Sequence, residues 1–150
     1  MCIFCQIVAG KSPSYKVWED SKHLAFLSIF PNTKGVTVLV TKEHYSSNFT
    51  KLPTKVREDL IAASAKVSDL LVKAFPSAGR CALVFEGFGV NHIHAKLFPL
   101  HGTNDEKWKP ISSGRKDFVT NYEGCVSTHD GNLMDSATLQ KWVEQIKSVG

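Results

Sequence analysis

Residues 90–99 alternate between apolar and polar side chains along most of their length, which limits the possible folds more than any other segment does. Because successive side chains of a β-strand point to opposite faces, the pattern predicts a strand with one apolar and one polar face. The apolar face, expected to pack in a core, carries Ile93, Ala95 and Leu97. The polar face carries His92, His94 and Lys96. The chain is therefore expected to fold around a sheet that is covered on its apolar side.

Other patterns in the first hundred residues predict the remaining strands of this sheet and a helix that covers it. Further strands rich in β-type residues are predicted at 15–19, 23–29, 36–40 and 81–85. Apolar residues recur at steps of three and four from Val56 to Ala74, which predicts a long helix with Thr54 as its N-cap. Hairpin-length links between these elements favour an antiparallel α+β domain of about five strands, one long covering helix and a C-terminal helix.

The pattern weakens after residue 102, so the chain is divided into a domain at 1–102 and a C-terminal extension at 103–150 that packs on it. In this extension 122–128 is a further candidate strand. A helix after Asp135 or Ser136 is indicated by the apolar spacing of Leu139, Val143 and Ile146.

Composition excludes several classes of protein. No apolar run among the 150 residues exceeds five, far short of the roughly 20 that span a bilayer, and no secretory signal is visible. We therefore expect a cytoplasmic protein without a membrane partner. The net charge is +4, and because acidic residues separate the lysines and arginines, no nucleic-acid partner is expected. A mild positive excess still suits small phosphorylated ligands.

The two imidazoles on the polar strand face allow three interpretations. A neutral imidazole can act as a nucleophile toward phosphorus when its other ring nitrogen is held by an acceptor and cations lie nearby. A His-x-His pair on a strand can also supply half of a metal site. Thirdly, the pair can be partly buried and hydrogen-bonded without any chemistry. Spacing alone leaves all three open.

Several motifs, in order, carry a resemblance to a known family. They are Cys-Ile-Phe-Cys-Gln-Ile-Val-Ala-Gly at 2–10, Pro-Ser-Tyr-Lys-Val-Trp-Glu-Asp at 13–20 and Gly-Val-Thr-Val-Leu-Val-Thr-Lys-Glu-His-Tyr at 35–45. Residues 92–98 fill the signature His-φ-His-φ-His-φ-φ, where φ is apolar, except that Lys96 replaces the third histidine. Over residues 2–102 the chain is similar to the histidine triad (HIT) family of nucleotide hydrolases and transferases.

The resemblance implies a covalent mechanism and a homodimer. His94 corresponds to the nucleophile that attacks the α-phosphate of nucleoside phosphoramidates or dinucleoside polyphosphates and carries the nucleotidyl group. His92 would support the site, and Lys96 would stand in for the third histidine. Because Lys96, Ser28 and Gly89 depart from the family pattern, a non-catalytic nucleotide- or partner-binding module on the same fold is the alternative.

The resemblance also implies substrate contacts and a structural zinc ion. The substrate-binding residues would be Phe26, Leu27, Ser28, Ile29, Gly87, Phe88, Gly89 and Val90. The zinc ligands would be Cys2, Cys5, His44 and His92. Two thiolates and two imidazoles are the composition of a closed structural zinc site. The opposing interpretation leaves the two cysteines as free thiols and His44 on the surface.

Overall fold

The computed structural model describes residues 2–105, 107–128 and 132–148. The chain divides into two compact units, Met1–Trp108 and Lys109–Gly150. The packing of the C-terminal extension on the first domain stays a prediction. Among the described residues no helix combines the length and apolar character needed to cross a membrane.

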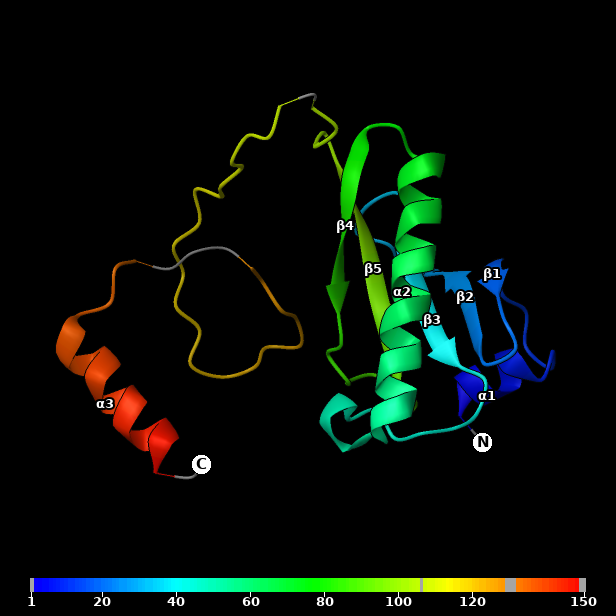
Figure 1. The fold of residues 1–150 in the computed structure, drawn as a ribbon, viewed down its shortest axis with the longest axis horizontal. Helices are drawn as coiled ribbons and strands as arrows, with labels where there is room; N and C mark the ends of the chain where they lie inside the picture. The colour runs from blue at the N-terminus through cyan, green and yellow to red at the C-terminus, as the bar shows by residue number, and fades with distance from the viewer. Residues whose placement is uncertain (1, 106, 129–131, 149–150) are drawn as a thin grey trace. The chain divides into compact units, whose positions relative to one another are not determined.

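A five-stranded antiparallel sheet is the centre of the first unit (Figure 1). Its strands, in chain order, are β1 (Lys16–Glu19), β2 (His23–Leu27), β3 (Thr37–Thr41), β4 (Ala78–Val84) and β5 (His94–His101). They lie side by side in the order β1-β2-β3-β5-β4, so β1 and β4 are the edge strands. The predicted α+β class and strand number are confirmed.

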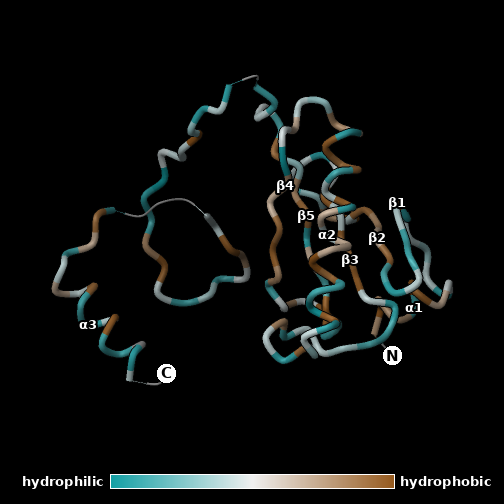
Figure 2. The backbone as a smooth tube through the Cα atoms, in the orientation of Figure 1, coloured by the Kyte–Doolittle hydropathy of each residue, from teal (hydrophilic) through white to brown (hydrophobic). Residues whose placement is uncertain are grey.

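The long helix α2 (Thr54–Ala74) covers one face of the sheet (Figure 1). Apolar and polar residues alternate along it (Figure 2), and its apolar stripe packs on alternate strand residues. The shared core includes Leu60, Val67, Leu71, Ala25, Leu39, Ile93, Ala95 and Leu97. The core face predicted from the alternation is therefore confirmed. The N-cap prediction is wrong: Thr54 is the first helical residue, and Pro53 occupies the cap position without a side-chain hydrogen bond.

The opposite face of the sheet is partly covered by a short helix that the sequence analysis did not predict. Helix α1 (Ile3–Val8) packs Phe4, Ile7 and Val8 against a second apolar cluster on β2 and β3. That cluster contains Leu24, Phe26, Val38 and Val40. The N-terminal residues thus lie over the same sheet face that carries His94 and Lys96, which places α1 next to the candidate chemistry.

The second unit contains helix α3 (Ser136–Lys147), as the apolar spacing predicted. Phe118 stacks on Trp142 of α3, with the ring centroids 6.5 Å apart. The candidate strand at 122–128 is not formed. Gly124 has a φ of +88°, which interrupts an extended backbone, and the apolar side chains Tyr122 and Val126 are exposed.

Candidate functional site

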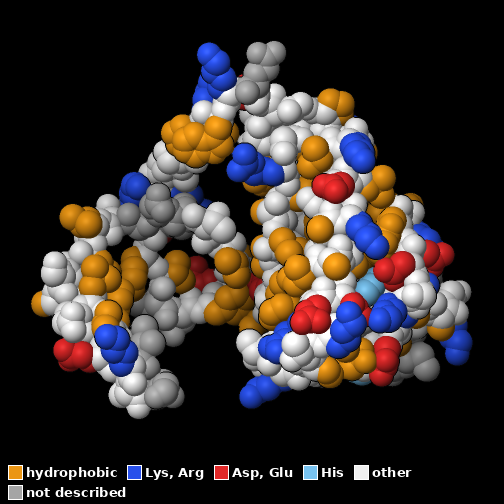
Figure 3. All heavy atoms as spheres, in the orientation of Figure 1, with side chains coloured by type: hydrophobic (Ala, Val, Ile, Leu, Met, Phe, Trp, Pro, Cys, Tyr) orange, Lys and Arg blue, Asp and Glu red, His pale blue; other side chains and the backbone are white. Residues whose placement is uncertain are grey.

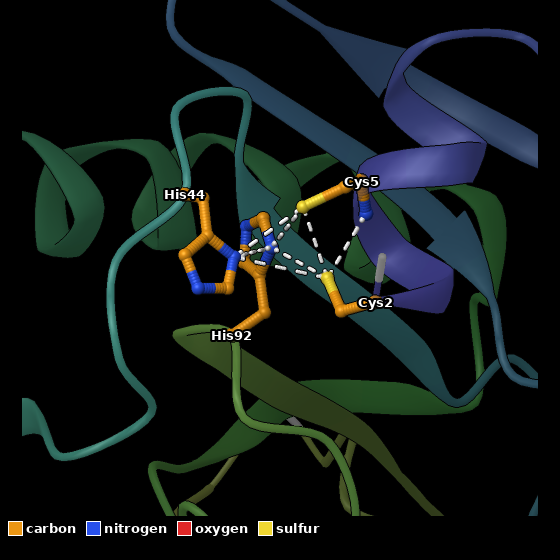
Figure 4. Close-up of side chains that lie close together, drawn as sticks. All are labelled: Cys2, Cys5, His44 and His92. Carbon is orange, nitrogen blue, oxygen red and sulfur yellow. Dashed lines mark hydrogen bonds between the residues drawn. The ribbon is translucent and has the colours of Figure 1, made fainter.

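Four side chains from distant parts of the chain meet at one end of the sheet (Figure 4). They are Cys2, Cys5, His44 and His92, and their ligand atoms all lie within 4.8 Å of one another. Cys2 is the N-cap residue of α1, and Cys5 lies within that helix. His44 follows β3, and His92 precedes β5. The four residues predicted as metal ligands are brought together.

The spacing of these atoms fits a tetrahedral metal ion. Zinc bonds of about 2.0–2.1 Å to nitrogen and about 2.3 Å to sulfur place neighbouring ligand atoms roughly 3.3–3.8 Å apart. The two Nδ1 atoms of His44 and His92 are 3.3 Å apart, and the sulfur–nitrogen distances run from 3.3 to 3.8 Å. The two sulfurs are closer, at 3.0 Å. The cluster could hold a metal ion after a small separation of the thiols.

Hydrogen bonding fixes which nitrogen of His92 faces the cluster. Its ring is fully buried, and Nε2 lies 2.8 Å from the carbonyl oxygen of Thr41, so Nε2 carries the proton and donates. The Nδ1 lone pair is thereby left for the cluster. Burial lowers the pKa of His92, and the neighbouring His44 and His94 lower it further. His92 is therefore held as the neutral imidazole that binds metals.

The two thiols of the cluster are not equivalent. Burial opposes ionisation of Cys2, but its hydrogen bonds with the thiol and backbone N–H of Cys5 outweigh this and lower its pKa. The same thiol–thiol hydrogen bond, together with burial, raises the pKa of Cys5. Of the two thiols, Cys2 is therefore the more readily ionised.

One part of the strand prediction is wrong. His92 does not belong to the strand that carries His94 and Lys96, because β5 begins at His94. Pairing with β3 ends at Val40 opposite His94, and the N–H of His92 instead donates to the carbonyl of Val90 in a tight bend. This bend turns His92 toward the two cysteines, while His94 remains on the sheet.

His94, the residue predicted as the nucleophile, is buried and held by a backbone hydrogen bond. Its Nδ1 lies 2.8 Å from the carbonyl oxygen of His92, so Nδ1 donates and Nε2 keeps an unprotonated lone pair. Only 3% of its surface is exposed, and the ring of Phe4 packs edge-on at 5.3 Å. Burial lowers the pKa of His94, and the charge of Lys96 lowers it further against the opposing charge of Glu86. The imidazole is therefore neutral near pH 7.

Lys96 lies two residues beyond His94 and on the same face of β5. Its Nζ is 3.1 Å from Oε2 of Glu86, which follows the neighbouring strand β4. The side chain of Glu86 is only 10% exposed, whereas that of Lys96 is 37% exposed. Glu86 was not among the residues predicted from the sequence, because its contact with Lys96 depends on the pairing of β4 with β5. The pairing of Val84 with Lys96 brings the segment after β4 to this place.

The predicted substrate residues lie on two segments of the first unit. Phe26 is buried in the cluster under α1, in the same row across the sheet as Lys96, since both pair with Val38. After it, Leu27 and Ser28 are half-buried and Ile29 is exposed. The second segment is the turn after β4, formed by Gly87, Phe88, Gly89 and Val90. Both glycines of this turn adopt positive φ, +79° and +89°.

Charged residues are interspersed elsewhere on the surface. On the face drawn in Figure 3, lysine and arginine side chains alternate with acidic ones over the sheet-and-helix unit. That face offers no continuous basic surface of the kind that binds nucleic acids.

Residues 9–103 of the chain match the HIT domain. An adenosine 5′-monophosphoramidase of Schizosaccharomyces pombe is 32% identical over 102 residues, which are 65% of this chain and 73% of the relative. An adenylylsulfatase of Arabidopsis thaliana is 27% identical over 148 residues, which are 93% of this chain and 74% of the relative. A crystal structure from Streptococcus mutans UA159 superposes with a TM-score of 0.65 at 30% identity, covering 98% of this chain and 83% of that chain.

Proposed function

Because the chain belongs to the histidine triad (HIT) family, we propose that it is a nucleotide hydrolase or nucleotidyltransferase with a nucleotidyl-His94 intermediate. The observation that carries the proposal is the hydrogen bond from Nδ1 of His94 to the carbonyl of His92, 2.8 Å long. It leaves Nε2 as an unprotonated, oriented nitrogen, which is what a nucleophilic imidazole requires.

The reaction consists of two displacements at the α-phosphorus of a nucleotide. Nε2 of His94 first donates its lone pair to phosphorus, and the bond from phosphorus to the leaving group breaks. The hydrogen bond from Nδ1 to the His92 carbonyl stabilises the positive charge that the ring acquires. In the second displacement a water molecule, or another acceptor, attacks phosphorus. The P–N bond then breaks, Nε2 recovers its lone pair, and the acceptor's proton is released to solvent.

The metal cluster is assigned a structural role next to this reaction. The donor set of Cys2, Cys5, His44 and His92 fits zinc, and with four protein ligands the ion would have no open position for substrate. When bound, it supplies a cross-link between the N-terminal helix and the bend before β5. His92 would then serve twice, with its ring toward the metal and its carbonyl toward His94.

The substrate class is taken from the family and from the segments beside the site. Nucleoside phosphoramidates and dinucleoside polyphosphates are the candidate substrates, since one relative is a monophosphoramidase. The segment Phe26, Leu27, Ser28 and Ile29 would contact the base and ribose. The turn Gly87, Phe88, Gly89 and Val90 would approach the phosphates through its backbone. The homodimer is proposed from the family alone.

Turnover and binding, measured together, test the enzyme proposal against a binding module. The wild-type chain should release AMP from adenosine 5′-phosphoramidate or a dinucleoside polyphosphate, and His94→Ala should lower kcat by about 10⁴-fold. His101→Gln, at the far end of the same strand, is the matched control and should retain turnover. Nucleotide binding without product in the wild-type chain would instead support the binding module, which the replacement of the third histidine by Lys96 motivates.

A further inference from the structure

A fixed pair of opposite charges lies beside the nucleophile. His94 and Lys96 project from the same face of β5, about 7 Å apart along the strand. The ammonium of Lys96 contacts the carboxylate of Glu86 at 3.1 Å. Since Glu86 is largely buried and Lys96 is more than a third exposed, the carboxylate anchors the ammonium from the protein side. An ammonium has three donors, so others remain for a ligand.

The leaving group determines what kind of neighbour the nucleophile needs. When a P–N bond breaks, the departing amine must gain a proton, because an amide anion is too basic to leave. An imidazole is well suited to supply that proton, since it titrates near neutral pH. When a P–O bond to phosphate or sulfate breaks, the oxygen departs with the electron pair as an anion and needs no proton. It needs positive charge.

Lysine meets the second need better than the first. Its ammonium is a compact, permanent positive charge at neutral pH, whereas an imidazole is mostly neutral there. The carboxylate of Glu86, 3.1 Å away, holds the ammonium in place beside the nucleophile. The pair therefore gives a departing oxyanion a fixed positive charge and hydrogen-bond donors. For a departing amine it provides only a weak acid, because the ammonium of a lysine titrates far above neutral pH.

From this arrangement we infer that the site is selective for nucleotides whose leaving group departs as an oxyanion, such as phosphate, a nucleotide or sulfate, over nucleoside phosphoramidates. The inference rests on the proposed function and narrows its substrate class. Lys96 contacts the departing oxygen, and Glu86 is a positioning residue that acts through Lys96. In the balanced first step, the bond from Nε2 of His94 to phosphorus forms, the P–O bond breaks, and the oxyanion leaves unprotonated beside the ammonium.

Matched adenylyl substrates with different leaving groups test this selectivity. Adenosine 5′-phosphosulfate and diadenosine triphosphate release oxyanions, whereas AMP-morpholidate and adenosine 5′-phosphoramidate release amines. For the wild-type chain, kcat/KM should be higher with the oxyanion substrates. Lys96→His, which restores an imidazole, should lower the ratio of oxyanion to amine kcat/KM by about 100-fold. Lys16→His, on β1 and paired with Glu19, is the control and should leave the ratio unchanged.

Glu86→Gln separates a positioning role from a merely structural one. The substitution keeps a similar side-chain shape but removes the carboxylate charge. With the oxyanion substrates, kcat should therefore fall by a larger factor than KM rises. Glu86→Asp, which keeps the charge, should recover part of the lost kcat. If Lys96→His leaves the ratio of oxyanion to amine kcat/KM unchanged, or if the wild-type chain prefers amine leaving groups, the selectivity is overturned while the proposed function stands. Absence of product from both classes would overturn the proposed function itself.

Discussion

Removal of the proposed zinc ion should release the N-terminal helix and lower the free energy of unfolding. Helix α1 has six residues, fewer than the roughly 12–15 that an isolated helix needs in water. It is held by Cys2 and Cys5 and by three half-buried apolar side chains, Phe4, Ile7 and Val8. At about 1 kcal/mol for each half-buried side chain, releasing the helix costs roughly 3 kcal/mol. For a chain of this length, that lowers Tm by about 6–12 °C.

Thermal unfolding of the zinc-loaded chain, with and without a chelator, measures this loss. Cys5→Ser should unfold near the Tm of the chelated wild type and no longer respond to chelator. The control is Cys125→Ser, whose cysteine is exposed and lies in the second unit, and it should respond as the wild type does. A chelator effect below about 2 °C, or an equal effect on Cys5→Ser, would refute the reasoning.

Two further predictions concern the nucleophile and the turn after β4. Because burial lowers the pKa of His94 from its ordinary value of 6.5, the acid-side midpoint of kcat/KM should lie below pH 6.5, and a midpoint at or above 6.5 contradicts the assignment. Gly87→Ala should cost about 1–2 kcal/mol in urea unfolding, because φ is +79° and a Cβ would lie 3.0 Å from the carbonyl oxygen of Ser47. Gly114→Ala has open space and should be neutral; equal losses in both variants would remove the backbone explanation.

The elements with a long periodic pattern could be predicted from the sequence. The alternation through Ile93, Ala95 and Leu97 describes side chains of one core, and the predicted helical stripe joins it from Val56 to Val67. Beyond Val67 the stripe was wrong, because Leu71 is buried whereas Leu70 and Ala74 are exposed. Because the buried side chains must be apolar, the two-residue period of the strand and the 3.6-residue period of the helix are visible in the sequence. Helix α1 is too short to display a period, and its stability comes from packing and from the cysteine cluster.

The candidate site was predictable only in part, for a related reason. The cluster of Cys2, Cys5, His44 and His92 followed from the family resemblance, because no periodic pattern joins residues about 40–90 positions apart. The bend that removes His92 from β5 depends on where pairing with β3 ends. The contact between Glu86 and Lys96 depends on the register of β4 against β5, which is a property of the folded sheet.

The central claim is that Nε2 of His94 forms a transient bond to phosphorus, and the mass of the trapped intermediate tests it most directly. The chain is mixed with an adenylyl substrate, quenched within the first turnover at alkaline pH, and digested. The account predicts an acid-labile adenylyl group on the peptide that contains His94, and its absence from His94→Ala. Product formation at the wild-type rate by His94→Ala, or an adenylyl group on another residue alone, would contradict it.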